Sequence, residues 1–146
     1  MSHGEHMQLA IAKILGLSNT QETDSWNFWV PQIRKGIPKK ALIHCLQALH
    51  VSLSDAERVL PITARTLQRY DMETVLKPDV SGHVIALAKV YSQAVEVFED
   101  EEKARRWLKK PSRTLGGNIP FFLLDSPMGI QAVEDELERI EHGVYY

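Results

Sequence analysis

The sequence lacks the features that mark several large classes of protein. Cys45 is the single cysteine among 146 residues, so no internal disulfide can form, and a lone thiol in an apolar helical pattern is typical of a reducing compartment. No apolar run approaches the roughly 18 residues of a membrane-spanning helix. The polar start, MSHGEHM, has no apolar stretch like that of a secretory signal. We therefore expect a cytoplasmic protein with no membrane partner.

Strand-forming patterns are also nearly absent. No window alternates cleanly between apolar and polar residues, and no repeat of about 20 to 50 residues recurs along the chain. The composition, with 44% hydrophobic and 25% charged residues, is that of an ordinary globular protein. The sequence therefore predicts an all-α fold, with enough residues for one core or two small ones.

The net charge of −2 hides an uneven distribution along the chain. Residues 33–77 carry eight cations and four anions, whereas residues 96–146 carry seven cations and eleven anions. A basic middle and an acidic end indicate two surfaces with different partners. Random scatter of charges in a short chain is the alternative explanation.

The pattern is weak before residue 36 and becomes clear after it. A short helix ending at Gly16 and a polar loop lead into the aromatic residues Trp26, Phe28 and Trp29, which we expect to dock on the core. From Pro38 the apolar residues follow the spacing of one helix face. These residues are Leu42, Cys45, Leu46 and Leu49.

Two shorter helices are expected to follow. One covers residues 53–60, is capped by Ser52 or by a capping box of Ser54 and Glu57, and ends at Pro61. The other covers residues 64–70 and is capped by Thr63. Two short helices joined by a tight turn are typical of a helix-turn-helix motif.

A helix-turn-helix reads DNA through outward residues at the start of its second helix. Arginine pairs with guanine, glutamine pairs with adenine, and threonine contacts the thymine methyl group, while lysines neutralise phosphates. The candidate DNA-contacting residues are Thr63, Arg65, Thr66, Gln68, Arg69, Lys39 and Lys40. The turn holds Pro61 where many such motifs have glycine, and it is one residue longer than the common form. The segment alone therefore leaves open a helical bundle with a solvated basic face.

The second half predicts four further helices, two of them before a turn-rich connection and two after it. Ser81 is expected to cap a long helix over residues 82–98, followed by a helix over residues 99–108 and the short apolar helix FFLLD. The last helix, residues 128–142, has an apolar stripe opposite an acidic face. The stripe is Ile130, Val133, Leu137 and Ile140, and the acidic face is Glu134, Asp135, Glu138 and Glu141. Gly116 and Gly117 allow a tight connection, but they lack the pattern of a phosphate-binding loop.

The spacing over residues 107–144 resembles the toxin-binding domain of the Xre/MbcA/ParS family of antitoxins. The matching positions are Trp107, Leu108, Pro111, Leu115, Gly116, Gly117, Pro120, Leu123, Leu124, Gly129, Val133, Leu137, Ile140, His142 and Gly143. We interpret Trp107, Leu115, Val133 and Leu137 as core residues, since apolar residues at helical spacing face inward. The resemblance covers residues 82–144 closely and residues 36–80 more loosely, as an Xre-like helix-turn-helix.

The resemblance implies a domain organisation and a function. It implies an N-terminal extension (residues 1–35), a DNA-binding domain (36–80) and a toxin-binding domain (81–146). Antitoxins of this family bind a RES-type toxin, an ADP-ribosyltransferase-like protein that consumes NAD, and cover the entrance to its NAD pocket. They form homodimers and larger complexes with the toxin, and they repress their own operon at a palindromic operator. The implied toxin-binding residues are Glu138, Arg139, Glu141, His142, Val144, Tyr145 and Tyr146.

The sequence gives no sign of an enzyme. The six histidines are scattered without metal-binding spacing, and no serine lies in a nucleophile elbow. Cys45 lies on an apolar helix face, where thiols are normally inert. We therefore expect no catalytic residues, no metal and no cofactor. The alternatives are a stand-alone helix-turn-helix regulator whose C-terminal domain only dimerises or senses a ligand, and a protein adaptor whose DNA motif is degenerate.

Overall fold

The computed structural model describes residues 9–17 and 25–143. Their regular secondary structure is helical, with no β-strand beyond two isolated bridges in the described ranges, which confirms the predicted all-α class. The chain divides into two compact units, Ala10–Lys89 and a second that contains the residues from Val90 onward. No described helix is long and apolar enough to cross a membrane.

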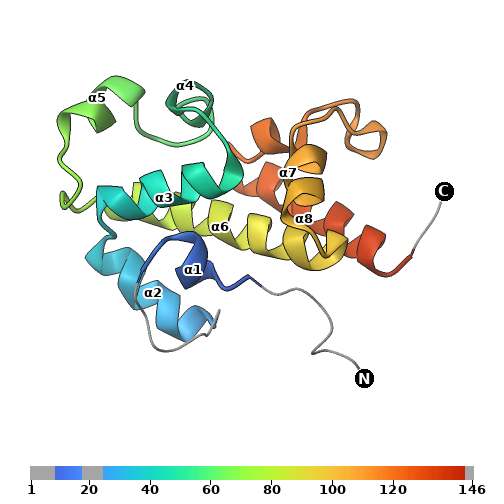
Figure 1. Ribbon diagram of the computed structural model, residues 1–146, viewed down its shortest axis with the longest axis horizontal. Helices are drawn as coiled ribbons and strands as arrows, with labels where there is room; N and C mark the ends of the chain where they lie inside the picture. Colours follow the sequence, from blue (N-terminus) through green and yellow to red (C-terminus); the bar gives the residue numbers. More distant parts are fainter. Residues whose placement is uncertain (1–8, 18–24, 144–146) are drawn as a thin grey trace. The chain divides into compact units, whose positions relative to one another are not determined.

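The first unit contains α1 to α5 and the first half of α6 (Figure 1). The helices are α1 (Ile11–Ile14), α2 (Trp26–Lys35), α3 (Lys39–Leu49), α4 (Leu53–Ala56), α5 (Ala64–Arg69) and α6 (Pro78–Phe98). The predicted stripe of α3 is confirmed, because Leu42, Cys45, Leu46 and Leu49 are all buried. Helix α1 packs on α3, where the His44 ring nitrogen Nδ1 lies 2.8 Å from the Ile14 carbonyl oxygen.

Helix α2 lies partly where the sequence predicted a loop. It begins at Trp26 and continues through Pro31, an uncommon residue within a helix. Trp29 is buried and packs edge-on against Phe28 at a ring-centroid distance of 4.9 Å. Trp26 remains 76% exposed. The expectation that the aromatic cluster docks on the core is therefore right for Trp29 and wrong for Trp26.

Ser81 does not cap α6, contrary to the prediction. The helix begins at Pro78, and Ser81 lies within its first turns as a fully buried residue. Its hydroxyl accepts a hydrogen bond from the Ile37 backbone N–H at 3.0 Å and donates to the Leu76 carbonyl at 3.2 Å. Ser81 thus ties α6 to the segment that precedes α3.

Replacing Ser81 with alanine is expected to lower the free energy of unfolding by about 1–3 kcal/mol, because the Ile37 N–H would lose its buried partner. Urea denaturation followed by circular dichroism measures the change. Ser92→Ala, at a half-buried position of the same helix, is the control and should change stability by about 0.5 kcal/mol or less. Equal stability of the Ser81 and Ser92 variants would contradict this role.

The second unit contains the rest of α6, two α-helices and two short 3₁₀ helices. These are α7 (Glu101–Leu108), η2 (Arg113–Leu115), η3 (Pro120–Leu123) and α8 (Pro127–Glu141). The side chain of Asp100 caps α7 by accepting a hydrogen bond from the Lys103 N–H at 2.9 Å. Helix α8 packs on both 3₁₀ helices. The core of this unit includes Tyr91, Leu108, Leu124, Val133 and Leu137, each at most 1% exposed.

Candidate DNA-binding and partner-binding surfaces

The start of α5 is fixed by two side chains from outside the helix. As predicted, Thr63 is the N-cap: its hydroxyl oxygen accepts from the Thr66 N–H at 3.0 Å. Glu57 accepts from the Ala64 N–H at 2.7 Å. Because the first N–H groups of a helix have no partner within it, these two contacts stabilise a helix of only six residues. Glu57 was predicted as an alternative member of a capping box with Ser54. The structure instead shows Ser52 as the cap of α4.

Helix α5 presents a polar outer face. Arg65, Gln68 and Arg69 are exposed, while Leu67 is buried. Thr66 is half-buried, and its hydroxyl accepts a hydrogen bond from the Thr63 hydroxyl at 2.9 Å. Three of the candidate base-contacting residues thus share an open surface, and the two threonines also hold the helix cap.

The two candidate phosphate-binding lysines at the start of α3 have partners within the chain. Lys39 Nζ donates to the Tyr70 carbonyl oxygen at 2.8 Å, which connects α3 to the end of α5. Lys40 Nζ forms an ion pair with Glu73 at 3.1 Å, and both side chains are largely exposed. Exposed pairs of this kind contribute at most about 1 kcal/mol, so Lys40 can exchange Glu73 for a phosphate at little cost. The structure therefore adds a positioning contact for Lys39 that the sequence did not reveal.

The end of α8 carries the described part of the candidate toxin-binding set. Glu138, Glu141 and His142 are exposed, and Arg139 is half-buried. The other candidates, Val144, Tyr145 and Tyr146, lie outside the described residues. The described part of this surface is therefore mostly acidic.

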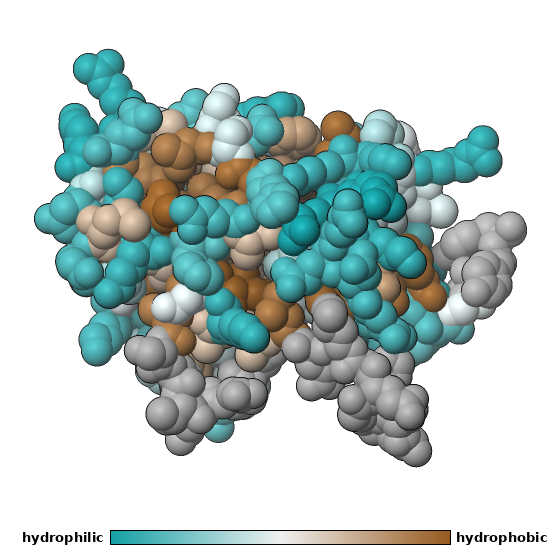
Figure 2. Space-filling view, viewed as in Figure 1, coloured by the Kyte–Doolittle hydropathy of each residue, from teal (hydrophilic) through white to brown (hydrophobic). Residues whose placement is uncertain are grey.

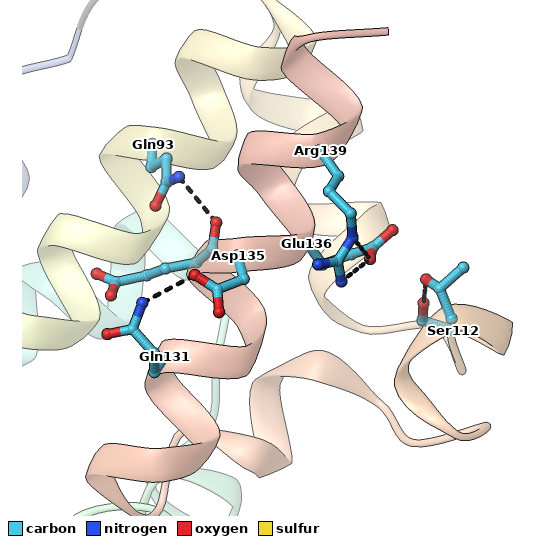
Figure 3. Close-up of polar contacts among 8 residues, drawn as sticks. Gln93, Ser112, Gln131, Asp135, Glu136 and Arg139 are labelled. Atoms are coloured by element: carbon cyan, nitrogen blue, oxygen red, sulfur yellow. Dashed lines mark hydrogen bonds and ion pairs between the residues drawn. The ribbon is translucent and has the colours of Figure 1, made fainter. Parts of the chain in front are cut away.

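Glu136 is a buried carboxylate that the sequence analysis placed on neither face of α8. It is 3% exposed, and Arg139 binds it through Nη2 at 2.6 Å and Nε at 3.1 Å. Figure 3 shows both side chains on the side of α8 nearer the loop that contains Ser112. Arg139 is thus held by an internal ion pair, which compensates the charge of Glu136 in the core.

The opposite side of α8 is attached to α6. Gln93 donates through its side-chain amide to the Glu134 backbone carbonyl at 3.2 Å, and Gln131 donates to the Asp135 carboxylate at 2.8 Å (Figure 3). The predicted core residues Val133 and Leu137 are fully buried. Of the two hydrogen bonds, the one from Gln93 joins α8 to α6, and the one from Gln131 lies within α8.

The described residues contain no cluster of three or more side chains able to hold a metal ion. Burial raises the pKa of the Cys45 thiol to about 12, so it stays protonated at neutral pH. Burial, followed by the hydrogen bond to Glu101, raises the pKa of Tyr91 to about 12. We therefore interpret Tyr91 and Cys45 as residues that stabilise the fold.

Comparison with known proteins matches both units of the chain. The model of the antitoxin Xre-like helix-turn-helix domain matches residues 28–89. The model of the antitoxin Xre/MbcA/ParS C-terminal toxin-binding domain matches residues 93–143. A protein named Antitoxin Xre from Yersinia enterocolitica is 30% identical over 109 residues, which cover 70% of this chain and 74% of that protein. The chain belongs to the Xre/MbcA/ParS antitoxin family.

Two further relatives show how far the similarity to this Xre-family chain extends. Antitoxin Xre from Photorhabdus laumondii is 37% identical over 67 residues, or 45% of each protein. A protein named Prs ADP-ribosylating antitoxin, from a Sphingobium species, is 28% identical over 123 residues, or 77% of each. The chain spans 45% of the Photorhabdus protein and 58% of an Antitoxin Xre from Pseudomonas putida.

The helix-turn-helix match extends into the amino-terminal part of this Xre-family chain. The helix-turn-helix match begins at residue 28 and so includes most of α2, which the sequence analysis assigned to an extension without resemblance. The weak apolar pattern and Pro31 concealed this helix. The predicted domain boundaries at residues 35 and 80 stay predictions.

Proposed function

We propose that this chain is the antitoxin of a type II toxin–antitoxin pair that binds and inhibits a RES-type, NAD-consuming toxin and represses its own operon. The observation that carries the proposal is that one chain matches the family models of both a helix-turn-helix domain and a toxin-binding domain. The name of the Sphingobium relative, which refers to ADP-ribosylation, supports a toxin of the ADP-ribosyltransferase type. The chain acts by binding, without catalysis or a cofactor of its own.

Operator binding is assigned to α5 and to the start of α3. Arg65, Gln68 and Arg69 supply base contacts from an exposed face. Lys40 supplies a phosphate contact, and Lys39 supports the end of α5 through Tyr70. A palindromic operator requires two copies of the motif, so repression implies a homodimer. Binding should weaken steeply as salt rises, since phosphate contacts release counterions.

Toxin inhibition is assigned to the end of α8 and the residues that follow it. The exposed Glu138, Glu141 and His142 would contact the toxin beside its NAD pocket. The terminal tyrosines at 145 and 146 would enter the pocket entrance, because aromatic side chains are enriched at interface centres. Larger toxin–antitoxin complexes then follow from a dimeric antitoxin.

Deleting residues 144–146 is expected to weaken toxin inhibition while operator binding stays unchanged. The loss of two aromatic anchors should lower the affinity for the toxin about 30-fold or more. Titration of NAD consumption by the toxin measures the change, and an operator gel shift provides the control. Full inhibition by the shortened chain would mean that the tail does not contact the toxin.

The proposal as a whole is tested by co-purification with the product of the adjacent gene, which the proposal expects to be a RES-type protein. A stable complex in size-exclusion chromatography is expected, together with salt-sensitive binding of the chain to the upstream DNA. DNA binding without a complex would favour the stand-alone regulator. A complex without DNA binding would favour the adaptor.

A further inference from the structure

The second unit contains a strongly basic segment despite the acidic balance of its sequence. Residues 103–124 contain six cations and no anion, and the acidic residues of residues 96–146 lie before or after this segment. The cations are Lys103, Arg105, Arg106, Lys109, Lys110 and Arg113. The acidic end of α8 is therefore only one of two charged surfaces in this unit, and the toxin-inhibition proposal does not use the other.

Half of these cations lie around a tryptophan, on one face of α7 or just after its end. Lys103, Arg106 and Trp107 have the spacing i, i+3 and i+4, which places them along one face of α7, and Lys110 follows just after the helix ends at Leu108. Ala104 and Leu108 form the buried face of the same helix. The charged face of α7 is therefore not needed to attach the helix to its core.

The side chains of this face and of the residues just after α7 line an open pocket of about 390 Å³. Phe98, Trp107 and Pro111 supply its apolar lining, and Lys103, Arg106 and Lys110 supply its cations. The Phe98 and Trp107 rings lie 5.9 Å apart at an angle of 42°. Trp107 was expected to be a core residue, but it is only half-buried and lines this pocket.

The pocket remains positively charged after its internal ion pair is counted. Arg106 lies 3.7 Å from Glu102, and both side chains are more than half exposed, so this pair is weak. An apolar cavity bordered by cations is complementary to an apolar side chain flanked by carboxylates. Figure 2 shows hydrophilic and hydrophobic areas interspersed on the visible face of the molecule.

We propose that this pocket is a docking site for an acidic segment of the toxin, separate from the α8 surface that covers the NAD pocket. An aromatic or aliphatic side chain of the toxin inserts between Trp107 and Pro111, and the neighbouring carboxylates bind Lys103 and Lys110. The inference rests on the proposed function for the identity of the partner. A protein segment fits better than nucleic acid, because a nucleic-acid strand is bound along an extended basic groove, whereas these cations border one compact apolar pocket.

The test compares two charge-reversed variants with the same net charge. Lys103→Glu/Lys110→Glu changes the pocket, and Lys109→Glu/Arg113→Glu changes two exposed cations of the same segment that do not line it. All four side chains are exposed, so both variants should fold, as circular dichroism and unchanged operator binding would verify. Affinity for the RES-type protein is expected to fall about 10-fold or more in the pocket variant and less than about threefold in the control.

A second probe keeps the test independent of the toxin. A labelled peptide with four acidic residues around one phenylalanine should bind the wild-type chain and should not bind the pocket variant. Replacement of its phenylalanine by alanine should abolish binding. Failure of the wild-type chain to bind the RES-type protein would contradict the proposed function. Binding of the peptide would then still show whether the pocket accepts an acidic segment.

Three results would overturn the inference. The first is an equal loss of toxin affinity in both variants. The second is a wild-type chain that does not bind the peptide. The third is a pocket variant that changes only the binding of single-stranded DNA or the self-association of the chain. The last result would assign the pocket to nucleic acid or to a second copy.

Discussion

Replacing both Arg65 and Arg69 with alanine is expected to abolish specific operator binding and to leave toxin inhibition intact. Each arginine that pairs with a guanine contributes about 1–3 kcal/mol to recognition. The double variant should therefore bind the operator at least about 30-fold more weakly. Both side chains are exposed on α5, so their removal leaves Leu67 and the Thr63 cap in place. A gel shift with the operator and an NAD-consumption assay measure the two activities separately.

Lys109→Ala/Arg113→Ala provides the control for this variant, because it removes two exposed cations from the second unit. It should bind the operator about as well as the wild type, apart from a small effect of net charge. If the Arg65/Arg69 variant lost both activities, α5 would be a structural helix. If it kept full operator binding, the DNA contacts would lie elsewhere.

The second large effect is expected at Gly129. A Cβ atom at this position of α8 would lie 1.8 Å from the Leu123 carbonyl oxygen and 2.9 Å from the carbonyl carbon. The contact is with backbone, so no side-chain rotation relieves it. Gly129→Ala is expected to lower the free energy of unfolding by about 3 kcal/mol or more. Hydrogen exchange should locate the loss of protection in residues 90–143, and toxin binding should fall with it.

Gly82→Ala is the matched control, since Gly82 is also a glycine within a helix. Its added Cβ would lie 3.3 Å from a methyl carbon of Ile33, a side chain that can shift. Alanine also favours the helical state by about 1 kcal/mol, so the net change should be small. If the two alanine variants were equally stable, the close approach at Gly129 would not constrain the fold.

Residues whose structure depends on near neighbours were predicted well. The cap of α5 by Thr63, the buried stripe of α3 and the buried positions Val133 and Leu137 of α8 all follow from patterns within one turn or two. Helix α4 was predicted to extend to residue 60 but ends at Ala56. Glu57 comes directly after it and caps α5 instead. The sequence pattern of α4 or of α5, taken alone, does not show which of the two helices the Glu57 side chain will join.

Residues whose role depends on distant partners were missed. Ser81 has the chemistry of a helix cap, but its partner is the Ile37 N–H, 44 residues away. The sequence signal that was available is Pro78, which is favoured at the first position of a helix. Glu136 was unassigned because its burial requires the packing of α8 on η2 and η3. The α7 pocket was missed for the same reason, since Trp107 was counted as core.

The most direct test of the account is NAD consumption by the RES-type protein in the presence and absence of this chain. The two proteins are co-expressed and co-purified, and NAD is then measured with the toxin alone, with the complex and with the chain lacking residues 144–146. The account predicts rapid NAD loss with the toxin alone, none in the complex, and partial loss with the shortened chain. Unchanged NAD loss in the presence of the full chain, with no complex formed, would contradict the antitoxin function and favour a stand-alone DNA-binding regulator.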